Sequence, residues 1–104
     1  MTDQMMRKRI KDNILEVDPN VEVWLYGSRA RGTAREDSDW DILILSPKDT
    51  VSTRDESRFV DHMCNLIVET GEYIQVLAYG KRDWHGRHSV TAFYQNIQQE
   101  AQRL

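Results

Sequence analysis

Three aspartates at alternate positions, Asp37, Asp39 and Asp41, are the residues of this chain best suited to chemistry. They stand directly before an apolar run, Ile42–Leu45, that is typical of a buried strand. Side chains two positions apart on a strand point to the same face, so a strand that begins near Asp39 projects the carboxylates of Asp39 and Asp41 together. Two such carboxylates repel each other and favour a hard divalent cation that also binds phosphates. The pattern therefore predicts a Mg²⁺ or Mn²⁺ site at Asp39 and Asp41.

A glycine–serine bend, Gly27-Ser28, ends another apolar run, Val21–Tyr26, and precedes the basic segment Arg29–Arg35. Glycine allows a phosphate to approach the backbone closely, and the start of a helical turn offers unpaired N–H groups to an anion. The short link from this bend to Asp39 suits an antiparallel pair of strands. We therefore expect the anion site and the acid pair to lie at the same end of the sheet.

Three other interpretations of the acid cluster fit the sequence less well. An EF-hand loop that begins at Asp37 requires glycine at its sixth position and glutamate at its twelfth, where this chain has Ile42 and Lys48. An acid pair that ends a strand, as in haloacid-dehalogenase phosphatases, requires the apolar run before it, whereas here the run follows. An inert solvated turn is disfavoured because two arginines stand between Gly27 and Gly32.

The segment Gly27–Gly32, followed at a fixed interval by Ser38–Asp41, resembles the signature of the minimal nucleotidyltransferase family. This family belongs to the DNA polymerase β-like nucleotidyltransferase superfamily. The resemblance extends over roughly residues 5–80, and its specific part is the segment from Gly27 to Asp41. Neither half of the motif is specific alone, but the two halves together, each beside an apolar run, are a strong signal.

The resemblance implies a Mg²⁺-dependent enzyme that moves a nucleoside monophosphate from a nucleoside triphosphate, with ATP expected, to a hydroxyl group. Small members of the family resemble the antitoxin half of toxin–antitoxin pairs, whose partner is a HEPN-domain protein and whose acceptor can be a tyrosine of that partner. A domain of this size lacks walls for a small acceptor, which favours a protein acceptor or a pocket completed by a second copy of the chain. The implied site comprises catalytic and metal-binding Asp39 and Asp41, and nucleotide-binding Gly27, Ser28, Arg29 and Arg31.

The same resemblance implies an α/β (α+β) fold, in which helices flank a small mixed three-stranded sheet in the order α-β-α-β-α-β-α. Periodicity along the chain agrees with this order. The expected long elements are a helix over 5–17, strands over 21–26 and 39–45, a helix over 53–70, a strand over 72–79 and a helix over about 89–104.

The third strand departs from the family's pattern at Gln75. A helical crossover should place this strand parallel to the second one, beside Asp39 and Asp41. The family has a third carboxylate there, which binds metal and deprotonates the attacking hydroxyl. Here the position holds Gln75, while Glu72 points to the opposite face. The alternative function is therefore a degenerate nucleotide-binding or partner-neutralising module with little or no transferase activity.

Length and composition limit the remaining possibilities. The 104 residues suit a single nucleotidyltransferase domain over 1–104, whose C-terminal helix packs on the domain or docks a partner. A net charge of −3 argues against general nucleic-acid binding. One cysteine excludes a disulfide framework, and no apolar run reaches the roughly 18 residues of a membrane span. With no signal peptide at the N-terminus, we expect a cytoplasmic protein.

Three local expectations concern packing. Thr53 and Glu56 have the spacing of a capping box at the start of the long central helix. Cys64, within that helix, is expected to fill a small space in the core. Trp84 is expected to cover the core after the third strand, and Gly71 to end the central helix.

Overall fold

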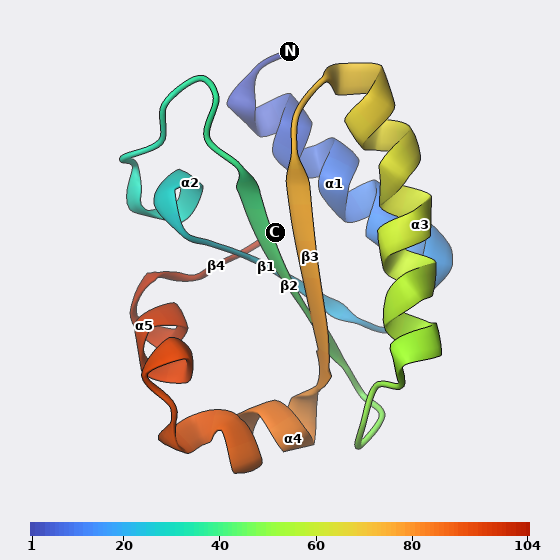
Figure 1. Ribbon diagram of the computed structural model, residues 1–104, viewed down its shortest axis with the longest axis vertical. Coiled ribbons are helices and arrows are strands. Elements are labelled where there is room, and N and C mark those ends of the chain that lie inside the picture. The colour runs from blue at the N-terminus through green and yellow to red at the C-terminus, as the bar shows by residue number, and fades with distance from the viewer.

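The structure is a computed structural model that describes residues 1–104. Its helices and strands follow the expected order, with additional short elements near the C-terminus (Figure 1). They are α1 (Asp3–Val17), β1 (Glu22–Tyr26), α2 (Ser28–Arg31), β2 (Trp40–Ser46), α3 (Thr53–Thr70), β3 (Ile74–Gly80), α4 (Lys81–His85), the 3₁₀ helix η1 (Arg87–Val90), α5 (Ala92–Glu100) and β4 (Gln102–Arg103).

The four strands form one mixed sheet in the order β3-β2-β1-β4. Strands β1 and β2 are antiparallel, with Glu22 opposite Leu45 at one end and Tyr26 opposite Asp41 at the other. Strands β2 and β3 are parallel, as a helical connection between them requires. The expected class, a small mixed sheet flanked by helices, is confirmed.

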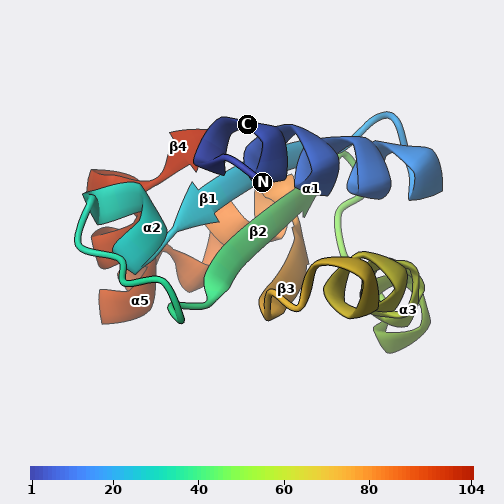
Figure 2. The ribbon, with the colours of Figure 1, turned by 90° about the horizontal axis from the view of Figure 1, so that it is seen from above.

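Helices cover both faces of the sheet (Figure 2). Helices α1 and α3 pack on one face, where the larger core includes Ile10, Ile42 and Phe59. Helices α4 and α5 lie over the other face, where a smaller core is built on Leu43, Trp84 and Ile97. Side chains of β2 alternate between these two cores, so the odd-numbered residues of β2 face α4 and α5.

The sequence predicted a sheet of three strands, whereas the sheet of the structure has four. The C-terminal helical pattern extends only from Ala92 to Glu100, and Ala101 adopts extended backbone. Gln102 and Arg103 then pair antiparallel with β1, and Leu104 N donates to the carbonyl oxygen of Val23. Two residues of β structure carry too weak a pattern to be recognised in a sequence.

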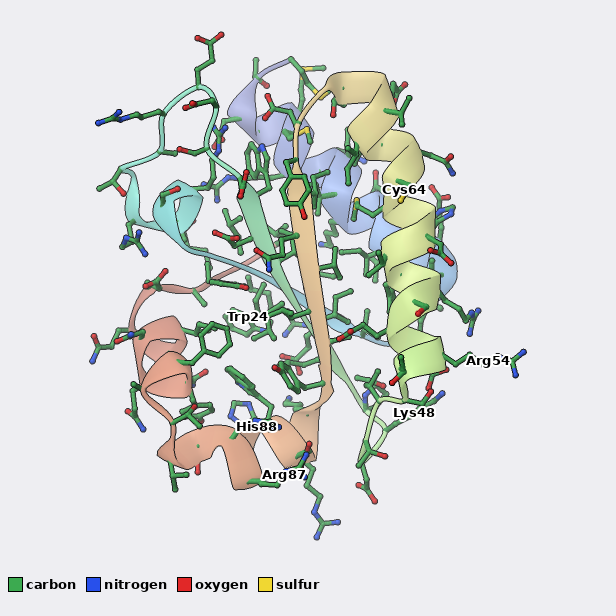
Figure 3. All side chains as sticks on the ribbon, in the orientation of Figure 1. Trp24, Lys48, Arg54, Cys64, Arg87 and His88 are labelled. Carbon is green, nitrogen blue, oxygen red and sulfur yellow. The ribbon has the colours of Figure 1, made fainter.

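Two local expectations about α3 were wrong. Ser52 rather than Thr53 is the N-cap, because the Ser52 hydroxyl accepts from Asp55 N at 3.1 Å. The Glu56 carboxylate instead accepts from Ala78 N on β3 at 3.1 Å. Cys64 is exposed on α3 (Figure 3), because the buried stripe of the helix runs through Phe59, Met63 and Leu66.

Two other expectations are confirmed. Trp84 of α4 is completely buried against Tyr79 and Tyr94. Gly71 ends α3 with a left-handed φ of 71°. No helix of the structure is both long enough and apolar enough to cross a membrane.

Candidate functional site

The candidate site begins where β1 and β2 separate, at Gly27 and Asp41. Tyr26 and Asp41 form the last pair of the β1–β2 ladder, so the chain leaves β1 at Gly27 directly beside the Asp41 side chain. Gly27 has a φ of 76°, and a β-carbon placed on it would lie 2.2 Å from Asp41 Oδ2. Only glycine accommodates both this conformation and this approach.

The carboxylates of Asp39 and Asp41 are close enough to influence each other. Asp41 is the second residue of β2 and belongs to its α4–α5 face, while Asp39 stands directly before the strand; Asp39 is exposed and Asp41 is partly buried. Burial and the neighbouring Asp39 and Glu100 charges raise the pKa of Asp41, while Arg31 opposes this shift. An Asp41 carboxylate that is destabilised by a second, neighbouring carboxylate fits a site for a single divalent cation of the Mg²⁺ type.

The site offers two carboxylate ligands rather than three. No group of three or more histidine, cysteine, aspartate or glutamate side chains is arranged to hold a metal ion. Asp41 lies directly opposite Gln75 in the parallel β2–β3 pair, and Gln75 is exposed. Glu72 instead accepts from Trp40 Nε1 at 3.3 Å, on the α1–α3 side of the sheet. The structure thus places both residues on the faces expected from the sequence, and neither supplies a third acid.

Arg31 and Arg29 occupy different environments although they belong to the same short helix. Arg31 contacts the Glu100 carboxylate at 3.0 Å, beside Gly27. The Arg29 guanidinium lies over the Trp40 ring at 4.6 Å from its centroid and donates to the carbonyl oxygen of Ser38 at 2.9 Å. Arg29 therefore fixes the loop before β2, while Arg31 is the arginine that lies beside Gly27 and influences Asp41.

A cavity of about 350 Å³ opens next to Arg29, but it lies across the sheet from Asp41. Met6 and Trp40, both members of the α1–α3 core, line it together with Glu72. The cavity is consequently separated from the carboxylate pair by the sheet itself.

Glu100 is a site residue that the sequence did not identify. It is the last residue of α5, and its Oε2 atom accepts from Gly27 N at 2.5 Å. Arg31 Nη1 donates to both of its oxygens, at 3.0 and 3.2 Å. Glu100 lies 73 residues after Gly27 in the sequence, and no local sequence pattern marks Glu100 as a site residue.

Tyr26 is a second site residue that the sequence did not identify. Its side chain is buried beside Asp41, with the Phe93 ring edge-on at 5.8 Å. Burial, together with the charges of Asp41, Tyr79 and Glu100, raises the pKa of Tyr26 to about 12. The phenol is therefore protonated at neutral pH and can act only as a weak acid and a hydrogen-bond partner.

Sequence comparison defines the class to which this fold and site belong. The model of the nucleotidyltransferase domain family matches residues 7–91, most of the chain, and the protein belongs to this family. The suspected kinship with nucleotidyltransferases is therefore confirmed. No curated protein matches the chain.

Several solved structures similar to this fold are toxin–antitoxin complexes. One, a toxin–antitoxin with AMP-PNP, has a TM-score of 0.66 at 18% identity, over 92% of this chain and 69% of that one. A mutant MntA–HpeT complex gives a TM-score of 0.63 at 18% identity, over 94% of this chain and 70% of that one. A third, the tri-AMPylated HEPN toxin of Shewanella oneidensis with its MNT antitoxin, gives 0.64 at 16% identity, over 98% and 71%. At these sequence identities, the comparison shows a similarity of fold only.

Proposed function

We propose that this protein transfers a nucleoside monophosphate, with ATP as the expected donor, to a hydroxyl group of a protein. The observation that carries the proposal is the contact between Gly27 and Asp41, with Asp39 beside it. It combines a backbone N–H that can donate to an anionic oxygen with two carboxylates suited to a cation. The nucleotidyltransferase-family match over residues 7–91 supports the same chemistry.

Each site residue has a role in this proposal. Asp39 and Asp41 would hold a Mg²⁺ ion, which supplies charge neutralisation for the phosphates when bound. Gly27 and Ser28 would lie along the triphosphate, and Arg31 would offset its negative charge. In the reaction the acceptor oxygen bonds to the α-phosphorus, the bond from the α-phosphorus to the bridging oxygen of the β-phosphate breaks, pyrophosphate leaves, and the hydroxyl proton passes to water.

No carboxylate stands at the position from which it would accept the proton of the acceptor hydroxyl. Gln75 faces Asp41 at the position where a third acid would stand, and an amide cannot accept that proton. A tyrosine acceptor reduces this demand, because its pKa near 10 is far below that of an aliphatic hydroxyl. Phosphoryl-type transfer also depends mainly on positioning and charge stabilisation.

The open side of the site favours a macromolecular acceptor. Strand β3 is the edge of the sheet, and Tyr73 and Gln75 are exposed on the face that carries Asp39 and Asp41. No strand pairs with the outer side of β3; helix α3 runs alongside this strand (Figure 1), and Tyr73 and Gln75 remain exposed. We therefore propose a partner protein as the acceptor, specifically a HEPN-domain toxin, which is the kind of partner present in the Shewanella oneidensis complex of the same fold.

The decisive test is AMP transfer by purified protein. Incubation with ATP, Mg²⁺ and the proposed HEPN-domain partner should yield a partner whose intact mass is greater by one or more AMP groups. Asp39→Asn should abolish this product because it removes a cation ligand. Asp37→Asn is the matched control, since Asp37 is exposed in the preceding turn, and it should leave transfer intact. Equal loss in both variants, or transfer without Mg²⁺, would refute the proposal.

A second function, a nucleotide-binding or partner-neutralising module without transferase activity, is favoured by Gln75 alone. It predicts that AMP-PNP and Mg²⁺ bind in calorimetry while no AMP appears on the partner or on the chain itself. It also predicts that the toxin is inhibited equally by wild type and by Asp39→Asn. The two functions therefore differ in two measurements: the appearance of AMP on a protein, and the dependence of toxin inhibition on Asp39.

A further inference from the structure

The carboxylate of Glu100 occupies the anion-binding position of the candidate site. Gly27 N donates to its Oε2 atom at 2.5 Å, and Arg31 Nη1 lies 3.0 Å from the same oxygen. The Glu100 side chain is only 17% exposed. These charge-assisted contacts are the strong class of hydrogen bond, so the position is well suited to a negatively charged oxygen.

The same two donors are those that the proposed function assigns to the nucleotide. The Gly27 amide is the N–H that a phosphate would meet, and Arg31 is the arginine that lies beside Gly27. One N–H cannot serve a carboxylate and a phosphate oxygen together at full strength. A phosphate and the Glu100 carboxylate are therefore alternative occupants of one position.

Glu100 also adds a third negative charge near Asp41. Like charges at close range repel one another, so the entry of a further anion favours departure of one of the carboxylates. Only Arg31 compensates Glu100 directly. An arriving phosphate that attracts Arg31 would leave Glu100 without its partner.

The backbone that carries Glu100 is firmly anchored, so the exchange involves the side chain. Ile97, one turn earlier in α5, is buried in the α4–α5 core. Gln102 pairs with Leu25 in the sheet and donates to the carbonyl oxygen of Ala30 at 3.0 Å. Rotation of the Glu100 side chain toward solvent breaks none of these contacts.

We propose that Glu100 is an internal competitor of the triphosphate, which holds the Gly27–Arg31 position closed until a nucleotide displaces it. This inference rests on the proposed function, because it concerns the same site. Glu100 then sets the nucleotide affinity of the protein. Any partner that draws the Glu100 side chain away from Gly27 would strengthen nucleotide binding by the same competition.

The test compares wild type with Glu100→Gln and Glu100→Ala. Binding of AMP-PNP, and separately of tripolyphosphate, is measured by calorimetry with saturating Mg²⁺. Removal of the competing carboxylate should tighten both ligands by about tenfold or more, and Glu100→Ala should exceed Glu100→Gln because an amide oxygen can still accept from Gly27. Glu36→Gln, which removes an equal charge from an exposed residue of the nearby loop, should change neither affinity.

A measurement on the wild-type protein does not depend on whether the variants fold. The Gly27 amide proton, bonded to a carboxylate, should resonate far downfield in an ¹⁵N–¹H spectrum and should move when AMP-PNP or tripolyphosphate saturates the site. A Gly27 resonance that stays unchanged under saturating ligand overturns the inference. Equal or weaker affinity in folded Glu100→Gln and Glu100→Ala also overturns it.

These outcomes are separable from those of the proposed function. Tighter tripolyphosphate binding in the Glu100 variants, without AMP transfer by any variant, would reject the transferase and retain the competition. Transfer that depends on Asp39 while Glu100→Gln leaves both affinities unchanged would retain the transferase and reject the competition. Loss of transfer with unchanged affinity in Glu100→Gln would also reject the competition, and it would identify Glu100 as a participant in the reaction.

Discussion

Asp41 Oδ2 lies so close to Gly27 that a β-carbon on the glycine would stand 2.2 Å from it. Gly27→Ala should therefore displace the Asp41 carboxylate from its present position and abolish AMP transfer. Strain at the positive φ and the steric conflict together should cost roughly 1–3 kcal/mol of the free energy of unfolding. Urea unfolding and the transfer assay measure the two effects.

Gly32 supplies the matched control for this substitution. It has a φ of 77°, nearly that of Gly27, and no atom lies within 4 Å of the position its β-carbon would take. Gly32→Ala should thus show the backbone strain alone, about 1 kcal/mol, and retain transfer. If both variants lose transfer to the same degree, the Gly27–Asp41 contact has no special role.

Gln75 faces Asp41 across the parallel strands, and replacing it with aspartate would add a third carboxylate to the site. Gln75→Asp should raise Mg²⁺-dependent transfer, most of all toward acceptors less acidic than tyrosine, since the new acid can accept the hydroxyl proton. Without Mg²⁺ the same variant should be less stable than wild type because of like-charge repulsion. Gln4→Asp adds the same charge on an exposed part of α1 and should neither raise transfer nor lower stability.

Burial and the Asp39 charge raise the pKa of Asp41, so the ionised form of Asp41 destabilises the folded state. For a carboxyl group with a raised pKa, stability is greatest below the pKa of the unfolded chain and falls as pH rises through the folded-state pKa. Asp41→Asn should consequently match wild type in acid and exceed it in melting temperature at pH 7. Added Mg²⁺ should stabilise wild type and leave Asp41→Asn unchanged. A neutral-pH loss of stability in Asp41→Asn would contradict this account.

The sequence was informative where short-range spacing decides geometry. The interval of two residues between Asp39 and Asp41, together with the antiparallel pairing that a short link favours, correctly predicts that Gly27 lies next to the acids. The parallel crossover likewise predicts Gln75 beside Asp41, where the structure has it. In these cases the strand period and chain connectivity leave few alternatives.

The sequence was uninformative where a contact joins residues far apart in the chain. It was also uninformative where a shift of one residue changes which side chain caps a helix or faces the core. Glu100 reaches Gly27 only because Gln102 and Arg103 add a short strand beside β1, and nothing local distinguishes Glu100 from its polar neighbours. Thr53 and Ser52 are both good N-cap residues, so composition alone does not select between them. Cys64 lies next to Met63 in sequence, yet a helix turns about 100° per residue, and the two point in different directions.

Ser52 caps α3 through its hydroxyl, which accepts from Asp55 N at 3.1 Å. Ser52→Ala should reduce the free energy of unfolding by about 1 kcal/mol, because one helix-terminal N–H loses its acceptor. In a domain of this size this corresponds to a fall of about 4–8 °C in melting temperature. Thr53→Ala, at the first helical position, should have an effect of about a few tenths of a kcal/mol. A reversed order of the two variants would restore Thr53 as the cap.

Glu22 forms an ion pair with Lys81 at 2.5 Å, beside a second cavity of about 370 Å³ under α5. Burial acts to raise the pKa of Glu22, but its hydrogen bonds to Lys81 and to Trp24 Nε1 outweigh burial and lower the pKa. A carboxyl group with a lowered pKa stabilises the fold above its unfolded-state pKa, and this contribution is lost as pH falls through the folded-state value.

Lys81→Met should therefore cost roughly 1–2 kcal/mol at pH 7, since it leaves the Glu22 carboxylate partly buried without its cation. The difference from wild type should vanish in acid, once Glu22 is protonated in both proteins. Urea unfolding from about pH 2 to pH 7 measures this convergence. Lys8→Met, which breaks the exposed pair with Asp12, should cost at most about a few tenths of a kcal/mol. A loss in Lys81→Met that persists unchanged at low pH would show that the lysine stem, rather than the ion pair, stabilises this end of the sheet.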